Sequence, residues 1–465
     1  MVRYELLRQI PQVDEVLKDE RLLFFIDRMP GPVVTAAVRS VTDCIRAEIL
    51  AGDRDSVPMV ADIADRAARK LRESERPSLR RIINATGVIL HTNLGRACLS
   101  LRAREQTAAV AGCYSTLEYD LDSGQRGSRH SHVEQLICRV TGAEAAMVVN
   151  NNAAATMLCL SSLAQGKEVI TSRGELVEIG GSFRIPEIME LSGASLREVG
   201  TTNKTRIADY ESAFDAEKTG ALLKVHTSNY RVIGFTQEAS LAELVRLGRE
   251  KGCPVIYDMG SGLLLPMPAL PDEPTVTDAL KYGADVVLFS GDKLLGGAQG
   301  GVLAGKKVLI ERMKKHPLAR AIRADKLTLA AMEATFYEYL DPVGARRNIP
   351  VLRMLSAGRE ELRSAAYELS GRLTVSAPGC RVSVVDVEDK VGGGCAPLAV
   401  LPGCGVSVVC GLLRAEKLMK LLREADTPII ARILHDEVLI SMRTLQEGDA
   451  DEIVRTLTRL GDGKE

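Results

Sequence analysis

Between residue 82 and about residue 340, short apolar runs alternate with longer amphipathic stretches, and this alternation limits the possible folds more than any other feature. The runs are AAMVV (145–149), EVIT (168–171), ALLKVH (221–226), PVIYD (254–258) and ADVVLF (284–289). Such runs are typical of buried parallel strands, and the intervening stretches, such as 240–252, have helical periodicity. The pattern predicts an α/β fold with a doubly wound, mostly parallel sheet. Ligands bind such sheets beyond the carboxyl ends of the strands.

The segments on either side predict two further domains. Residues 1–75 have apolar residues at helical spacing and predict a small helical domain, followed by a large α/β domain over residues 76–345. DPVGARRNIP (341–350) has the composition of a boundary. Residues 346–465 predict a small α+β domain with a helix at 351–372, strands at 381–387, 405–410 and 437–443, and a closing helix at 449–460.

Composition excludes several classes of protein. The formal net charge of -1 gives no global signal for nucleic acid or membrane binding. The ten cysteines form no CxxC pair, so we expect no metal site and reduced thiols throughout. The charged N-terminus is unlike a signal peptide, and no apolar run approaches the length of a membrane span, so a cytoplasmic location and no membrane contact are expected.

Polar residues follow four of the predicted strands. Asn150–Thr156 opens a helix whose free N–H groups form a candidate phosphate cradle, although an ordinary helix cap has the same composition. Asn229 follows the third strand, Asp258 the fourth, and Ser290-Gly291-Asp292-Lys293 the fifth. Alone, Lys293 is more simply a solvated loop lysine. Together the four strand ends place an amide, a carboxylate and an amine beside the cradle.

Pyridoxal 5'-phosphate needs this set of groups. Lys293 is the candidate for the Schiff base, and Asp258 for the partner of the pyridine nitrogen. Asn152, Ala153 and Ser290 are candidates for holding the phosphate, and Asn229 for the ring oxygen. Asp292 is either a second acid–base group or a carboxylate that stabilises the turn.

Several motifs in their order along the chain resemble the bacterial selenocysteine synthase family, whose members are fold-type I pyridoxal-phosphate enzymes. They are RQIPQVDEVL (8–17), INATGVILHTNLGRA (83–97), YDLDSGQRGSRHSH (119–132), RGELVEIGGSFRIP (173–186), KVHTSNYRVIGF (224–235), YDMGSG (257–262), SGDKLLGGAQGG (290–301) and HPLARAIRADK (316–326). The likeness runs nearly the full length of the chain. Lys293 matches the cofactor lysine of that family.

The resemblance implies a fold-type I transferase that converts L-seryl-tRNA(Sec) to L-selenocysteinyl-tRNA(Sec). The implied reaction is loss of water from the seryl group, followed by addition of selenium from selenophosphate to an aminoacrylyl intermediate. The resemblance also implies that the N-terminal domain binds the tRNA and that dimers assemble into a ring-shaped decamer. The basic residues between Arg66 and Arg81 are compatible with tRNA contacts, although charge alone favours a solvated helix face.

The resemblance further assigns arginines to the selenium donor. Arg96, Arg320 and Arg323 match anion-binding arginines of the family, and Arg126 and Arg129 are weaker candidates. Surface ion pairs are the alternative for each. Arg432 and Arg443 are possible carboxylate ligands, but an ester substrate does not require one. Glu175, Leu176 and Glu178 lie near the expected position of the residue stacked on the cofactor ring, and none is aromatic.

Two other functions remain open at this stage. A related pyridoxal-phosphate lyase that acts on a small amino acid or an amino-sugar phosphate would share the large domain but would not need residues 8–17. A tRNA-binding protein without catalysis would not need Lys293, Asp258 and Asn229 together.

Overall fold

The computed structural model describes residues 2–179 and 183–461, which form two compact units that divide after Arg81. The first unit contains α1 (Val2–Arg8), α2 (Val13–Val16), α3 (Glu20–Ile26), α4 (Gly31–Ala51) and α5 (Val60–Glu75). Leu22, Phe25, Val38, Ile45 and Leu71 belong to its apolar core. Gly52 ends α4 with φ of 87°, a left-handed conformation that glycine adopts without strain. Residues 1–75 are thus helical, as the sequence predicts.

The large sheet of the second unit has the strand order β3-β11-β10-β9-β8-β4-β7. Its strands are β3 (Ala145–Val149), β4 (Glu168–Ser172), β7 (Ser195–Val199), β8 (Thr219–Val225), β9 (Val255–Gly260), β10 (Val286–Ser290) and β11 (Gly301–Gly305). All pairings are parallel except those of β11, which runs antiparallel to β10 and β3. The predicted doubly wound, mostly parallel sheet is confirmed.

Helices cover both faces of this sheet. Met147, Leu223 and Leu288 point into a core with α8 (Asn152–Ala164), α9 (Ile185–Leu191) and α13 (Lys307–Lys315). Val148 and Val287 point into the opposite core with α7 (Ser131–Thr141), α12 (Val276–Tyr282) and α15 (Lys326–Glu338). Neighbouring residues of a strand thus enter different cores, which explains the uninterrupted apolar runs in the sequence. The other helices of this part are α6 (Leu101–Ala111), α10 (Ile207–Ala213), α11 (Leu241–Lys251) and α14 (Pro317–Ala321).

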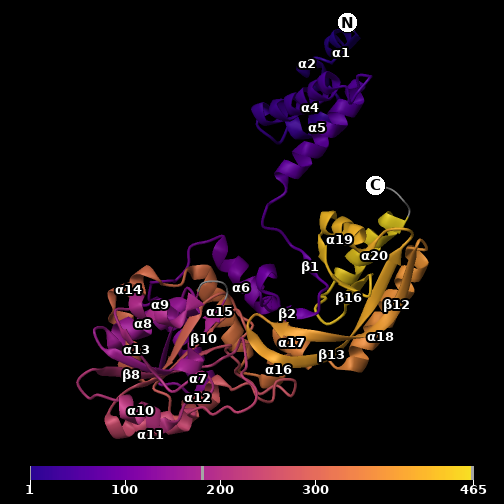
Figure 1. Ribbon diagram of the computed structural model, residues 1–465. Coiled ribbons are helices and arrows are strands. Elements are labelled where there is room, and N and C mark those ends of the chain that lie inside the picture. Colours follow the sequence, from indigo (N-terminus) through magenta and orange to yellow (C-terminus); the bar gives the residue numbers. More distant parts are fainter. Residues whose placement is uncertain (1, 180–182, 462–465) are drawn as a thin grey trace. The chain divides into compact units, whose positions relative to one another are not determined.

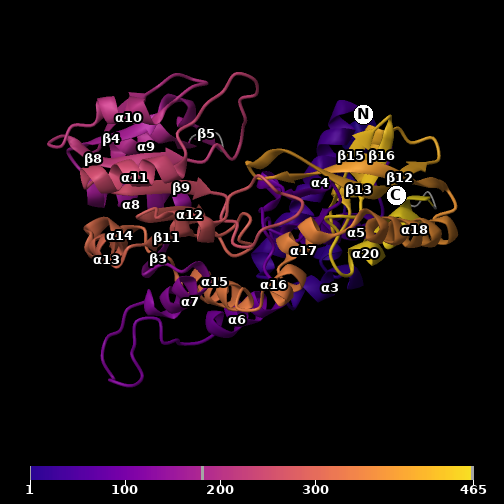
Figure 2. The ribbon, with the colours of Figure 1, turned by 90° about the horizontal axis from the view of Figure 1, so that it is seen from below.

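The C-terminal part is built on a second sheet with the order β15-β16-β13-β12-β2. Its strands are β2 (Val88–Leu90), β12 (Cys380–Gly392), β13 (Cys395–Cys410), β15 (Arg432–Leu434) and β16 (Glu437–Ser441), and β1 (Ile83–Asn84) pairs with β14 (Ile429–Ile430). α18 (Arg359–Ser376), α19 (Ala415–Glu424) and α20 (Asp449–Gly461) complete it. In both views α16 (Pro342–Asn348) and α17 (Pro350–Ser356) lie between the two sheets (Figures 1 and 2).

Several details differ from the predictions. The predicted helix at 351–372 is two helices, α17 and α18, with a break at Ala357-Gly358. Residues 83–90, predicted within the large domain, pair with C-terminal strands. The expectation of reduced thiols throughout is wrong for Cys380 and Cys410, which face each other across β12 and β13 and form a disulfide. Strand register brings the two sulfurs together, and composition carries no information about register.

Candidate active site

A cavity of about 290 Å³ opens at the carboxyl ends of β8, β9 and β10, beside the start of α8. Most of the predicted site residues line it. The lining consists of Arg96, Asn151, Asn152, Ala153, Val177, Val225, His226, Ser228, Asp258, Met259, Gly260, Ser290, Asp292, Lys293, Gln299 and Gly300. Strands far apart in sequence thus bring the predicted amine, carboxylate and phosphate cradle to one place.

Lys293 is a buried amine with a free nitrogen. Its residue is 4% exposed, so the solvated loop lysine is excluded. The turn that carries it is fixed by a hydrogen bond from the Leu294 N–H to the Ser261 carbonyl oxygen at 2.9 Å. Gly260 has φ of +69°, and a Cβ there would lie 3.8 Å from Lys293 Nζ. Within the described residues no side chain forms a hydrogen bond or ion pair with Nζ, so no partner in the fold competes with a covalent bond at this nitrogen.

Asp258 is a buried carboxylate held by two donors. Asn152 Nδ2 donates to Oδ1 and Thr156 Oγ1 donates to Oδ2, each at 2.9 Å. Burial raises the pKa of Asp258, while these two hydrogen bonds and the charges of Lys293 and His226 oppose the shift. Both donors come from the first turns of α8, so this helix orients the carboxylate as well as offering its N-terminus to an anion.

The start of α8 has the geometry of a phosphate cradle. Asn151 caps the helix by accepting a hydrogen bond from the Ala154 N–H at 2.9 Å, and the preceding N–H groups of Asn152 and Ala153 face the cavity lining. Asn152 Oδ1 and Ser228 Oγ are buried polar atoms without a hydrogen-bond partner in the described part of the chain. Unsatisfied buried polar atoms are costly unless a ligand completes them. These residues therefore fit an anionic, hydrogen-bonding cofactor.

Arg96 and Asp292 form an ion pair at the cavity. Arg96 Nη1 donates to Asp292 Oδ2 at 2.8 Å, and the backbone N–H of Ala97 donates to the Asp292 carbonyl oxygen at 3.2 Å. Arg96 has φ of 61°, in the left-handed region that few residues with a Cβ adopt. The guanidinium thus reaches the cavity from the loop before α6 and holds the carboxylate next to Lys293.

Three predicted residues do not line this cavity. Asn229 donates instead from Nδ2 to the Glu178 carbonyl oxygen at 2.9 Å. Arg320 and Arg323 are exposed, in a segment tied to the end of β3 by a hydrogen bond from the Asn150 N–H to the Ile322 carbonyl oxygen at 2.9 Å. This hydrogen bond places the segment beside the residues that precede α8, but neither arginine lines the cavity.

The other arginines have internal partners. Arg126 donates to Glu118 at 2.8 Å, and Arg129 pairs with the same carboxylate and with the Ala324 carbonyl oxygen. Arg443 is buried, and its Nε donates to Asp389 Oδ2 at 3.0 Å while its other nitrogens donate to backbone oxygens. Arg432 lies 3.6 Å from the same aspartate. Since Arg443 is engaged in this network, it is not free to bind a substrate carboxylate.

Some residues of the cavity escaped the sequence analysis. Val177, and not Glu175, Leu176 or Glu178, is the residue of that segment that lines the cavity. His226, Ser228 and Gln299 line it as well. His226 ends the run ALLKVH, and a histidine directly after a buried strand was the available signal. Alternation along residues 175–178 does not reveal which side chain faces inward, because the segment belongs to no long strand.

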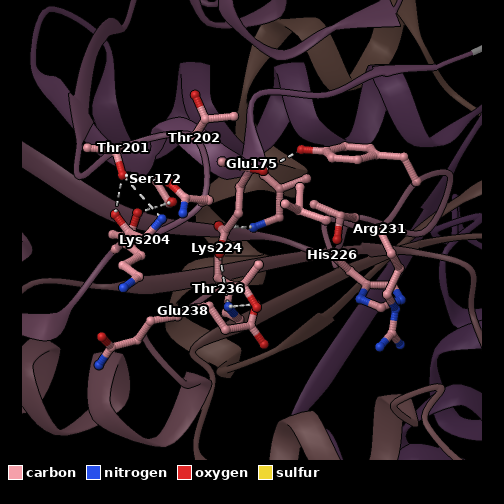
Figure 3. A pocket seen from close by; sticks show the side chains of 18 of the residues that line it. Ser172, Glu175, Thr201, Thr202, Lys204, Lys224, His226, Arg231, Thr236 and Glu238 are labelled. Atoms are coloured by element: carbon pink, nitrogen blue, oxygen red, sulfur yellow. Dashed lines mark hydrogen bonds and ion pairs between the residues drawn. The ribbon is translucent and has the colours of Figure 1, made fainter. Parts of the chain in front are cut away.

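A second, larger cavity of about 590 Å³, called the outer cavity below, adjoins the first and shares Val225 and His226 with it. Figure 3 shows His226 and Arg231 on one side of this outer cavity and Thr201 and Lys204 on the other. Lys224 donates to Glu175 Oε1 and to the Ala239 carbonyl oxygen, both at 2.9 Å. Burial lowers the pKa of Lys224, but the charges of Glu175 and Glu238 outweigh it and raise the pKa overall.

Comparison with known proteins identifies the family. Residues 82–446 match the family of L-seryl-tRNA selenium transferase, and residues 7–46 match the selenocysteine synthase N-terminal family. The chain belongs to the L-seryl-tRNA selenium transferase family. It is 48% identical to the L-seryl-tRNA(Sec) selenium transferase of Carboxydothermus hydrogenoformans, over 99% of this chain and 98% of the relative. Identity to the enzyme of the same name from Geobacter sulfurreducens is also 48%, over 97% and 98% of the two chains.

The solved structures give the same fold. A D-glucosaminate-6-phosphate ammonia-lyase superposes with a TM-score of 0.56 and 20% identity, over 83% of this chain and 96% of the other. The fold is that of the fold-type I pyridoxal-phosphate enzymes, as the resemblance implied. No helix among residues 2–179 and 183–461 has the length and apolar character needed to span a membrane. The same residues contain no group of three or more potential metal ligands.

Proposed function

We propose that this protein converts L-seryl-tRNA(Sec) to L-selenocysteinyl-tRNA(Sec) with pyridoxal 5'-phosphate as cofactor and selenophosphate as selenium donor. The observation that carries the proposal is the buried, unpaired amine of Lys293 in one cavity with Asp258. This pair occurs in a chain that matches selenium transferases along nearly its whole length. An internal amine and a buried acid at one strand edge are the two groups that this cofactor requires.

The chain's own residues define how the cofactor is held. Lys293 supplies the amine for its aldehyde, and Asp258 accepts from its ring nitrogen. The N–H groups of Asn152 and Ala153, with the Ser290 hydroxyl, bind the phosphate at the start of α8. When bound, the cofactor's pyridine ring takes up the electron pair that the substrate's Cα releases. The predicted contact of Asn229 with the ring oxygen has no support in the cavity lining, where Ser228 offers a buried hydroxyl instead.

Catalysis then depends on proton transfers at the seryl group. The amine of Lys293 takes the proton from Cα, the β-hydroxyl leaves as water, and selenium becomes bonded to the β-carbon. Asp292 holds the Arg96 guanidinium at the cavity, where an incoming anion would meet it. The seryl group is an ester of tRNA, which agrees with the internal engagement of Arg443.

Arginines bind the selenium donor in this proposal. Selenophosphate is a small, multiply charged anion, and the planar guanidinium pairs with phosphate oxygens through two parallel hydrogen bonds. Arg96 lines the cavity, while Arg320 and Arg323 are exposed next to the phosphate cradle and have no ion pair in the described residues. Arg126 and Arg129 share Glu118 and are the weaker candidates.

The proposal extends to partners and location. Residues up to Arg81 form the unit that binds the tRNA, and the chain assembles into dimers and a ring-shaped decamer in the cytoplasm. Exposed apolar side chains such as Tyr114, Leu121, Ile233 and Phe235 in loops of the second unit support self-association. Sedimentation of the purified protein measures the assembly; a monomer at micromolar concentration contradicts this part.

The alternative is a lyase that acts on a small amino acid or an amino-sugar phosphate, as the superposition with an ammonia-lyase allows. The deciding experiment supplies the purified protein and pyridoxal phosphate with seryl-tRNA(Sec) and selenophosphate, then identifies the amino acid esterified to the tRNA. Selenocysteine is the expected product. Unchanged serine, with turnover of an amino-sugar phosphate in a parallel reaction, supports the alternative instead.

A further inference from the structure

His226 occupies a position at the active site that the proposed mechanism does not yet use. It follows β8 directly, and its backbone N–H donates to the Asp258 carbonyl oxygen at 2.9 Å. His226 lines the same cavity as Lys293 and Asp258. In the proposed function this cavity receives the seryl group.

A buried carboxylate fixes the orientation of this ring. Glu273 Oε1 lies 3.2 Å from His226 Nε2, and the Glu273 side chain is 3% exposed. Within the described residues His226 is the sole side chain that contacts this carboxylate. The other ring nitrogen, Nδ1, has no hydrogen-bond partner in the same part of the chain. A histidine held through one nitrogen by a buried acid, with its second nitrogen free, is the arrangement of an oriented proton donor.

The other proton carriers of the cavity are already engaged. Lys293 takes the Cα proton, and Asp258 accepts from Asn152 and Thr156. Asp292, predicted as a second acid–base group, pairs instead with Arg96 at 2.8 Å. Histidine, in contrast, exchanges a proton near neutral pH.

We propose that His226, oriented by Glu273, is the general acid that protonates the departing β-hydroxyl of the seryl group. The Cα–H bond breaks, and its proton passes to the Lys293 amine while the electron pair is held by the bound cofactor's ring. The electron pair then forms the Cα–Cβ double bond as the Cβ–O bond breaks, and the oxygen takes the His226 proton and leaves as water. Hydroxide is a poor leaving group, so a proton donated to the oxygen as the bond breaks speeds elimination. The inference rests on the proposed function and assigns a new residue to it.

The surroundings of His226 allow it to recover its proton. His226 also lines the outer cavity of about 590 Å³ (Figure 3) and a further cavity of about 220 Å³. Solvent in either cavity can reprotonate the imidazole while the product still occupies the inner chamber.

The test compares two leaving groups in the holoenzyme without selenophosphate. Seryl-tRNA(Sec) must lose hydroxide and needs a proton, whereas β-chloroalanyl-tRNA(Sec) loses chloride and needs none. We expect His226→Gln to slow elimination from seryl-tRNA(Sec) by about 10²–10⁴-fold and to leave elimination of chloride within a few-fold of wild type. Glu273→Gln should show a smaller loss with the same dependence on the leaving group, since Glu273 is a positioning residue.

Controls separate this role from a structural one. His435→Gln, the same change in the exposed turn between β15 and β16, should alter neither rate. Equal loss of rate with both leaving groups, an unchanged rate of water loss, or loss of cofactor absorbance in His226→Gln would each overturn the assignment.

If wild-type protein does not act on seryl-tRNA(Sec), the proposed function fails separately. Serine methyl ester and β-chloroalanine methyl ester then repeat the comparison, and inactivity of wild type on both overturns the assignment as well.

Discussion

Lys293 and Lys224 are both buried lysines near the carboxyl edge of the large sheet, and their surroundings give them different chemistry. Lys224 donates to Glu175 and lies 3.5 Å from Glu238, so its charge is neutralised within the fold. Lys293 has no such partner among the described residues, although it is 4% exposed. The nitrogen of Lys293 is therefore left without a partner in the fold, and an aldehyde can bond to it covalently.

This difference predicts where the cofactor attaches. Borohydride reduction of the pyridoxal-phosphate-loaded protein should fix the pyridoxyl group on Lys293, and peptide mapping measures the site. Lys293→Ala should fold, lose the yellow colour and lose turnover. Lys306→Ala, which removes an exposed lysine paired with Asp285, is the matched control and should stay yellow and active. A label on Lys281 or Lys306 contradicts the assignment.

His130 predicts a pH dependence of stability. Burial, with a contribution from the nearby Lys314 charge, lowers the pKa of His130 to about 4 from its ordinary value of 6.5. The unfolded chain therefore binds the proton more readily, and stability falls as pH drops through the window from about 6.5 to about 4, by roughly 3 kcal/mol in total. When the pH falls from 7 to 5, the free energy of unfolding of His130→Gln, measured by urea titration, should decrease by about 2 kcal/mol less than that of wild type. His435→Gln should follow wild type; an equal acid loss in His130→Gln contradicts the prediction.

At the scale of single residues, the sequence predicted the polar groups that directly follow buried strands. Lys293, Asp258 and Asn152 stand at such positions, and all three line the cavity. Val177 and His226 were missed because their side-chain directions depend on tertiary packing. Asn229 shows the opposite error: a suitable amide follows the strand, but the loop turns its side chain to the Glu178 backbone.

At the scale of secondary structure, the strands of the large sheet with a continuous apolar run were predicted, and the remaining two, β7 and β11, were not. β7, with the sequence SLREV, is an edge strand with exposed side chains, and β11, GVLAG, follows the glycine-rich turn after Lys293. At Gly301 a Cβ would lie 2.1 Å from the Asn151 carbonyl oxygen, so glycine lets this strand pass the phosphate cradle. Residues that read as a loop thus form a strand whose glycines serve close packing at the site.

The segment from His316 to Lys326 carries a prediction for the selenium donor. Arg320→Ala and Arg323→Ala should keep the yellow colour and the loss of water from seryl-tRNA(Sec) but block selenium addition, since a guanidinium fork for the phosphate oxygens is lost. The aminoacrylyl-tRNA left after the loss of water should then decay to pyruvyl-tRNA, which is measured by hydrolysing the ester and quantifying the pyruvate released. Lysine at either position should restore only part of the rate, because it keeps the charge and loses the fork.

Arg312→Ala, in the last turn of α13, removes an exposed arginine from the neighbouring helix and serves as the control. It should transfer selenium normally. Loss of cofactor from the Arg320 or Arg323 variants would place these side chains at the pyridoxal phosphate. Normal selenium transfer would show that they do not bind the selenium donor.

At the scale of the whole molecule, the second unit is closed by segments from both of its ends. β1 and β2, within residues 83–90, pair with β14 and β12 from the C-terminal part. Cys395 lies next to the tip of the β12–β13 hairpin. Burial raises the pKa of its thiol to about 12, and the nearby charge of Lys293 opposes this shift. The fold of the second unit therefore depends on pairings between strands more than 300 residues apart in sequence, a connection that local sequence patterns do not contain.

The division of the chain after Arg81 predicts that the two units can be separated. A protein that begins at Ile82 should fold, bind pyridoxal phosphate and turn yellow, because the cavity residues and both sheets belong to the second unit. A protein that begins at His91 loses β1 and β2 and should unfold at lower temperature, so it is the control for where the boundary lies. Yellow colour in the longer form and its loss in the shorter form are the expected results.

The separated second unit also tests the assignment of tRNA binding. In the first unit, the side chains of Ile63, Ala67 and Leu71 are buried along one face of α5, while those of Arg69, Lys70 and Arg72 are exposed on its other face.

The full chain should bind tRNA(Sec) with an affinity that falls steeply with salt, because each phosphate contact releases counterions. The protein that begins at Ile82 should bind at least tenfold more weakly and with a shallower salt dependence. Arg72→Ala in the full chain should reduce the slope of log K against log salt by about 1 if this arginine contacts a phosphate. Filter-binding titrations between 50 mM and 200 mM salt measure all three proteins, and equal affinity with and without residues 1–81 would assign the tRNA to the second unit.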